Sequence, residues 1–72
     1  MELAGCIAYS KNSVELGRVD QSGHIRHVDE LVFRISRGAV YSVHDMYLGQ
    51  LRNGVGVTDR GELLFTLSPA FA

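Results

Sequence analysis

The side chains of this sequence that could carry acid–base, nucleophilic or metal chemistry are few and scattered. Three histidines, His24, His27 and His44, and the single cysteine, Cys6, are the residues suited to hold zinc. Because His24 and His27 are three apart on one expected strand, their side chains point to opposite faces and cannot grip one ion. His44 could join a metal site only across subunits. We therefore expect no metal and no cofactor.

No serine, threonine or cysteine lies in a known nucleophile motif. Ser42 and His44 would share a strand face, but a pair like that arises by chance in many sheets. We interpret Cys6 as a small, partly apolar strand residue. The carboxylates gather at expected turns, where solvated acids are normal. The sequence thus indicates no catalytic residue, and an enzyme whose site forms only between subunits is kept as an alternative.

Arginines recur on the expected strands and connectors and could form an anion-binding surface. The candidates are Arg18, Arg26, Arg34, Arg37 and Arg52. Tyr9, Tyr41 and Tyr47 could add rings on which nucleobases stack. Against this, seven Lys and Arg face eight Asp and Glu, so the chain lacks the basic excess typical of nucleic-acid binders. Binding of an anion or of single-stranded nucleic acid is accordingly the alternative function.

Four sequence repeats indicate which expected strands and turns carry these residues. The repeats cover 5–22, 23–37, 38–53 and 54–68, and each consists of a glycine, a short strand, a polar tip, a second strand and a polar connector. Asn53-Gly54 is the strongest turn signal, and no window keeps the apolar period of a helix. The repeats predict one all-β domain of four tandem antiparallel hairpins in a pseudo-four-fold small barrel. An SH3-like barrel is the alternative fold.

Alternation along the second strands predicts which face is buried, because successive side chains on a strand point to opposite sides. One face is mostly apolar and is predicted to form the core: Glu15, Gly17, Val19, Leu31, Phe33, Ile35, Tyr47, Gly49, Leu51, Leu63, Phe65 and Leu67. Its middle column alternates two glycines with two phenylalanines. We expect the two rings to fill the space that the glycines leave. Alternatively, the glycines mark β-bulges.

The opposite face of the same strands has one apolar column, which we expect to point outward. Its members, with the aromatic residue of the tail, are Leu16, Val32, Leu48, Leu64 and Phe71. Exposed apolar patches usually mark interfaces. A chain of 72 residues with one cysteine has a marginal core and no internal disulfide. We therefore predict a homo-oligomer, most simply a dimer, with a two-layer sandwich that covers both faces as the alternative.

The repeats, with second strands such as Tyr47-Leu48-Gly49-Gln50-Leu51, resemble the four-fold beta-flower domains of small bacterial proteins over roughly Gly5 to Leu67. The resemblance implies a pseudo-four-fold arrangement of hairpins and transfers no catalytic residue. No apolar stretch is long enough to span a bilayer and no basic segment begins the chain, so we expect a cytoplasmic location. The leading hypothesis is a non-enzymatic, oligomeric binding or interaction module.

Overall fold

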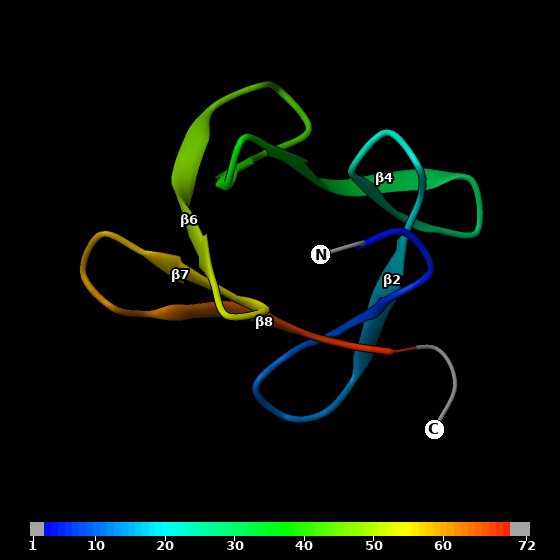
Figure 1. The fold of residues 1–72 in the computed structure, drawn as a ribbon, viewed down its shortest axis with the longest axis horizontal. Coiled ribbons are helices and arrows are strands. Elements are labelled where there is room, and N and C mark those ends of the chain that lie inside the picture. Colours follow the sequence, from blue (N-terminus) through cyan, green and yellow to red (C-terminus); the bar gives the residue numbers. More distant parts are fainter. Residues whose placement is uncertain (1–2, 70–72) are drawn as a thin grey trace.

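The protein folds into a closed antiparallel barrel (Figure 1), seen in a computed structural model that describes residues 3–69. Its strands are β1 (Ile7–Tyr9), β2 (Glu15–Val19), β3 (His24–His27), β4 (Glu30–Ser36), β5 (Ala39–Tyr41), β6 (Tyr47–Arg52), β7 (Val55–Thr58) and β8 (Leu63–Ser68). Each strand pairs with the next, and β8 closes the barrel on β1. The all-β barrel predicted from the repeats is confirmed. Residues 3–69 contain no helix that is long and apolar enough to cross a membrane.

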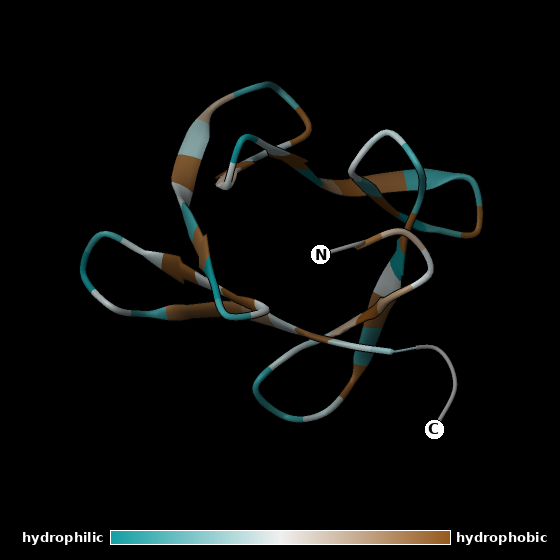
Figure 2. Cartoon of the chain, in the orientation of Figure 1, coloured by the Kyte–Doolittle hydropathy of each residue, from teal (hydrophilic) through white to brown (hydrophobic). Residues whose placement is uncertain are grey.

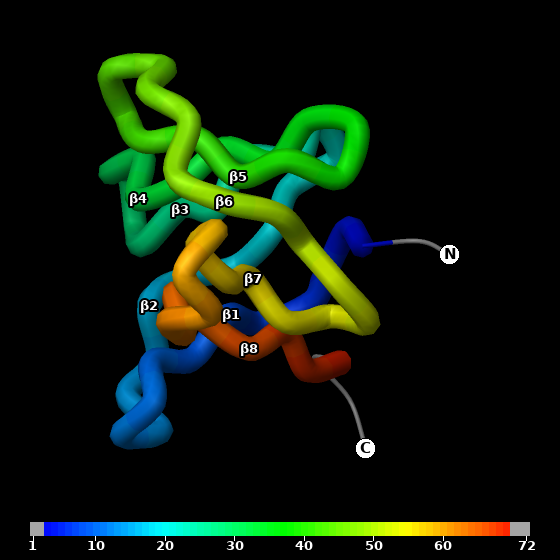
Figure 3. Tube along the Cα trace, turned by 90° about the vertical axis from the view of Figure 1, so that its left-hand side faces the viewer, coloured from blue at the N-terminus to red at the C-terminus, as the bar shows by residue number. Residues whose placement is uncertain are grey.

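The four hairpins are arranged around a common axis and point outward from it (Figure 1). They are β1–β2, β3–β4, β5–β6 and β7–β8, in sequence order around the barrel. Figure 3 shows the turns that join β4 to β5 and β6 to β7 at one end, with the tips of the first three hairpins toward the other. Figure 2 shows that the tips are mostly hydrophilic and that the apolar segments follow the strands. This matches the predicted pseudo-four-fold arrangement.

Short loops with side-chain caps form three of the tips. Ser10 and Ser42 each stand first in a five-residue loop, and Thr58 is the last residue of β7. Each of the three accepts hydrogen bonds from the backbone N–H groups two and four residues later. Such caps are the reason that serine and threonine favour turns. The Asn53-Gly54 turn has φ angles of 53° and 81°. Positive φ at both positions is typical of a type I′ turn, which confirms the turn signal read from the sequence.

The barrel core consists of six buried apolar side chains among the described residues, namely Ala8, Val19, Ile25, Ile35, Val40 and Phe65. Four of them belong to pairs of residues that oppose each other across a hairpin. The opposed pairs, one in each hairpin, are Ala8 with Gly17, Ile25 with Phe33, Val40 with Gly49, and Gly56 with Phe65. The rings of Phe33 and Phe65 come from opposite hairpins and meet with their centroids 5.2 Å apart. The two rings therefore meet as expected, but the space that they occupy is not the space at Gly17 and Gly49. Hairpins with a phenylalanine at this position alternate around the barrel with hairpins that have a glycine there, so that large and small residues pack together.

The two glycines of that column have a different role from the predicted one. A Cβ on Gly17 would lie 2.5 Å from the carbonyl oxygen of Arg26, and a Cβ on Gly49 would overlap that of Val57. Both therefore allow the next hairpin's backbone to approach closely. The glycine that makes room for a ring is Gly56, whose added Cβ would lie 2.7 Å from Phe65.

One β-bulge interrupts every hairpin and reverses the predicted faces on its tip side. The register shifts leave one extra residue on each second strand, namely Leu16, Val32, Leu48 and Leu64. A bulge breaks the two-residue alternation and can re-aim a side chain. These four side chains are half-buried and pack against the core. The prediction that they form an outward column is wrong, and Phe71, predicted beside them, lies outside the described residues.

The residues just before the bulges take the outer face instead. Tyr47 is 45% exposed and Leu63 is 38% exposed, and Glu15 is exposed too, although all three were predicted to be buried. The bulge brings Glu15 to the same side of β2 as Arg18, three residues later. Both side chains line the pocket at β2 and β3.

Aspartate substitutions are expected to distinguish the half-buried bulge positions from the exposed positions that precede them. Leu48→Asp should lower the free energy of unfolding by about 2–3 kcal/mol, because it places a charge against the core. Leu63→Asp, on the outer face, should change it by about 0.5 kcal/mol or less. Urea denaturation followed by circular dichroism measures both. Equal losses would contradict the bulge assignment.

Candidate anion-binding site

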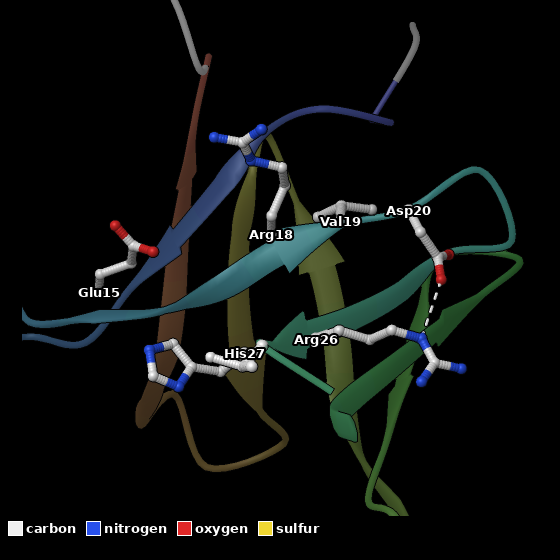
Figure 4. A pocket seen from close by; sticks show the side chains of 7 residues that line it. Glu15, Arg18, Val19, Asp20, Arg26 and His27 are labelled. Carbon is white, nitrogen blue, oxygen red and sulfur yellow. Dashed lines mark hydrogen bonds and ion pairs between the residues drawn. The ribbon is translucent and has the colours of Figure 1, made fainter. Parts of the chain in front are cut away.

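A shallow pocket of about 430 Å³ lies on the outer surface at strands β2 and β3 (Figure 4). Its lining comes from the second strand of one hairpin, the loop that follows and the first strand and tip of the next: Glu15, Arg18, Val19, Asp20, Arg26, His27 and Val28. The pocket thus combines two arginines, two acids and apolar groups. Of these residues, Arg18 and Arg26 are the anion-binding candidates that the sequence indicates, and His27 is one of the three histidines considered for a metal.

Arg18 and Arg26 lie directly opposite each other on the paired strands β2 and β3. Like charges in such cross-strand positions destabilise a sheet. Figure 4 shows that the side chain of Arg26 extends toward Asp20, whereas that of Arg18 extends away from Arg26. Arg26 Nε donates a hydrogen bond to Asp20 Oδ2 at 3.2 Å. Within residues 3–69, Arg18 has no ion-pair partner, so its guanidinium group is available for a ligand.

Asp20 organises one wall of the pocket. Its Oδ1 accepts hydrogen bonds from the backbone N–H groups of Ser22, at 2.8 Å, and His24, at 3.0 Å. The bond from the His24 backbone is the main reason that the pKa of Asp20 lies below its usual value, and Arg26 lowers it further. The carboxylate therefore stays ionised at neutral pH. Its contribution to stability is lost only as the pH falls below about 3.8, through the lowered pKa.

The pseudo-symmetric position in the other half of the barrel shows that the fold does not need this arginine pair. Gln50 on β6 and Val57 on β7 are opposed as Arg18 and Arg26 are. They line a smaller pocket of about 270 Å³. The same strand geometry thus accepts an uncharged pair.

Val28, at the rim of the pocket, has a strained backbone. It sits at the tip between β3 and β4 with a φ angle of 60°, and its side chain is 84% exposed. A β-branched residue in this region is a genuine outlier. Strain of this kind concentrates at ligand-contacting positions. Neither the strain nor the exposure is visible in the sequence, because valine is an ordinary strand residue.

Relieving this strain is expected to stabilise the protein. Val28→Gly removes a penalty of about 1–2 kcal/mol and adds about 0.5–1 kcal/mol of backbone entropy cost. The free energy of unfolding should rise by about 0.5–1 kcal/mol. Val14→Gly is the matched control, because Val14 is 59% exposed at another tip and is not among the positive-φ residues. It should not stabilise the protein, and equal changes in urea denaturation would show that Val28 carries no special strain.

The remaining candidate arginines lie elsewhere on the barrel. Arg34, on β4, forms an ion pair with Asp45 at 2.7 Å, and its guanidinium carbon lies 4.7 Å from the centre of the Tyr41 ring. Arg37 occupies the exposed turn between β4 and β5. Arg52 donates a hydrogen bond to Gln50 Oε1 at 3.1 Å. The structure therefore brings Arg18 and Arg26 together, places Arg34 on the strand that follows β3, and separates the other two.

Two of the three candidate tyrosines form a cluster next to Arg34. The rings of Tyr41 and Tyr47 meet edge to face, with centroids 6.1 Å apart. The Tyr47 hydroxyl donates a hydrogen bond to Asp59 at 3.0 Å, and this bond raises the pKa of Tyr47 above its usual value. The Tyr47 hydroxyl therefore stays protonated at neutral pH. The hydrogen bond also links the third hairpin to the tip of the fourth.

The residues considered for catalysis or metal binding are spread over several elements, with His24 and His27 on β3. Ser42 and His44 lie in one tip loop and not on a strand face, and Ser42 Oγ accepts the backbone N–H of His44. Cys6 is half-buried against the core, but it lies just before β1 and not on a strand as predicted. Among residues 3–69, no three His, Cys, Asp or Glu side chains gather to hold a metal ion.

The comparisons with known proteins add no identity to this geometry. No protein family, curated protein or solved structure matches the chain.

Proposed function

We propose that this protein is a non-catalytic binding module that holds an anionic group in the pocket at β2 and β3. The observation that carries this proposal is the directly opposed pair Arg18 and Arg26. Guanidinium groups present several N–H donors in a fixed geometry that matches carboxylate and phosphate oxygens. An anion bound in the pocket would be attracted by both positive charges. Val28 at the rim supplies an apolar contact for the rest of the ligand.

Isothermal titration with inorganic tripolyphosphate tests the pocket directly. Arg18→Ala should weaken binding about tenfold or more, because one charge-assisted hydrogen bond contributes about 1.5–3 kcal/mol. Gln50→Ala, at the pseudo-symmetric position, is the control and should bind as the unaltered protein does. Binding should also weaken as salt rises from about 50 to 200 mM. Equal affinities for the two variants would reject the site.

Asp20→Asn is expected to act in the opposite direction. Asparagine keeps an oxygen that can accept the backbone N–H groups of Ser22 and His24, but it removes the negative charge that holds Arg26. Affinity for tripolyphosphate should therefore rise several-fold, by roughly the value of one exposed charge interaction of about 1 kcal/mol. A loss of affinity would mean that Asp20 helps to hold the ligand by positioning Arg26.

Self-association is a second candidate, because large apolar side chains remain exposed at and beside the hairpin tips. They are Val14, Val28, Val43, Met46, Tyr47 and Leu63. Exposed apolar groups of this kind favour an interface when they lie together. Native mass spectrometry of the purified protein gives the subunit count. A dimer that dissociates in Met46→Asp would support a tip-mediated homo-oligomer, whereas a monomer at micromolar concentration would reject it.

A further inference from the structure

The arginine pair continues into an outer stripe that crosses five neighbouring strands. We call this the arginine–tyrosine stripe, and its members are Arg18, Arg26, His24, Arg34, Tyr41 and Tyr47. The strand pairings make the stripe continuous, because Arg18 opposes Arg26, His24 opposes Arg34, and Tyr41 opposes both Arg34 and Tyr47. Neighbouring strands lie about 4.8 Å apart, so the four intervals from β2 to β6 span about 19 Å along the barrel surface.

The two ends of the stripe differ in chemistry. Arg18 and Arg26 form the cationic end, in the pocket. Tyr47, at 45% exposure, forms the aromatic end, and its hydroxyl is held by Asp59. Arg34 lies between the two ends and already stacks over Tyr41. A charged track that leads to an accessible ring is the combination by which proteins hold single strands of nucleic acid, with phosphates on the arginines and a base on the ring.

Three acids near the stripe each hold one of its members in place, and Glu15, which lines the pocket, adds a further negative charge beside Arg18. Asp20 pairs with Arg26, Asp45 pairs with Arg34, and Asp59 accepts from Tyr47. These contacts pre-orient the side chains but reduce the net positive charge. We therefore expect an affinity that is modest and strongly dependent on salt.

We propose that the anionic ligand is a single-stranded polynucleotide that lies along the arginine–tyrosine stripe. Phosphates contact Arg18 and Arg26, and one base stacks on the exposed ring of Tyr47. This inference rests on the proposed function of the pocket. It adds that a nucleobase stacks on Tyr47 and that the strand follows the stripe between the two ends. A small anion or a polyanion without bases would use the cationic end alone.

Fluorescence anisotropy with two labelled probes tests the base and the phosphates separately. One probe is an oligothymidylate of about eight nucleotides, within the site sizes of small barrels. The other is an abasic deoxyribose phosphate strand of the same length. The oligothymidylate should bind about fivefold more tightly or better, since stacking of one base gives an effect of this size. Arg18→Ala should weaken both probes and lower the slope of log affinity against log salt by about 0.7.

Tyr47→Ala and Tyr47→Phe separate the contribution of the Tyr47 ring from that of its hydroxyl group. Both remove the hydrogen bond to Asp59, but only the alanine variant loses the stacking surface. Tyr47→Ala should bring the oligothymidylate down to the affinity of the abasic strand, while Tyr47→Phe should retain the difference between the probes. Equal binding of the two probes by the unaltered protein, with both weakened by Arg18→Ala, would overturn the polynucleotide inference and leave the anion pocket standing. If Arg18→Ala leaves the affinity for either probe unchanged, both proposals are overturned.

Discussion

Phe65→Ala is expected to lower the free energy of unfolding by about 3–5 kcal/mol, the usual cost of removing a buried phenyl ring. Phe65 is fully buried, and its ring packs against that of Phe33 in the centre of the barrel. Domains of this size have a total stability of only about 4–11 kcal/mol. The variant should therefore lose a large part of its stability in urea denaturation. Leu63→Ala, on the outer face of the same strand, is the control and should lose about 1 kcal/mol or less.

A double-mutant cycle with Gly56 shows whether the ring itself accounts for the loss. Gly56→Ala alone should destabilise the protein, because its Cβ would lie 2.7 Å from the tip of the Phe65 ring. In the Phe65→Leu background the ring is absent, and the added methyl group should cost less or even fill space. The coupling energy should be at least about 0.5 kcal/mol in the direction of rescue. Additive effects would mean that the two residues do not share this space.

The barrel could be predicted from the sequence because its repeats are punctuated by strong turn signals. Asn53-Gly54 forms the turn that its residue types favour, and the capped tips begin with Ser or Thr. The bulges could not be predicted, since an extra leucine or valine looks like any other strand residue. One inserted residue reverses the faces on its tip side. That is why Leu16 lies against the core and Leu63 lies outside, the opposite of what strict alternation indicates.

The arginines of the site could be named from the sequence, but their pairing could not. Which residue of β3 faces Arg18 depends on the loop from Asp20 to His24, whose Asp20 side chain accepts two backbone N–H groups. A loop one residue longer or shorter would oppose Arg18 to a different residue. Val28 gave no signal either, because valine rarely adopts a positive φ and its neighbours do not demand one. The opposition of Arg18 and Arg26 depends on loop length, and the position of Val28 depends on a strained backbone conformation. Residue types alone indicate neither.

Gly49→Ala is the second substitution with a large expected effect, and it tests the close approach of neighbouring hairpins. The φ angle of Gly49 is not in the left-handed region, so alanine suits its backbone conformation. The added Cβ would, however, overlap the carbonyl oxygen of Val57, which belongs to the backbone of β7 and cannot rotate away as a side chain can. The strands β6 and β7 would have to separate, at a cost of about 3 kcal/mol or more.

Gln50→Ala, one residue along the same strand and exposed, is the control for this experiment. It should change the free energy of unfolding by about 0.5 kcal/mol or less. Gly17→Ala should resemble Gly49→Ala, because a Cβ there would press on the backbone of Arg26 in the pseudo-symmetric position. If both glycine variants unfold at the same urea concentration as Gln50→Ala, the backbones do not approach as closely as the barrel geometry requires. Since Gly17 also sets the separation of β2 and β3, its variant should in addition disturb the opposition of Arg18 and Arg26 and weaken tripolyphosphate binding.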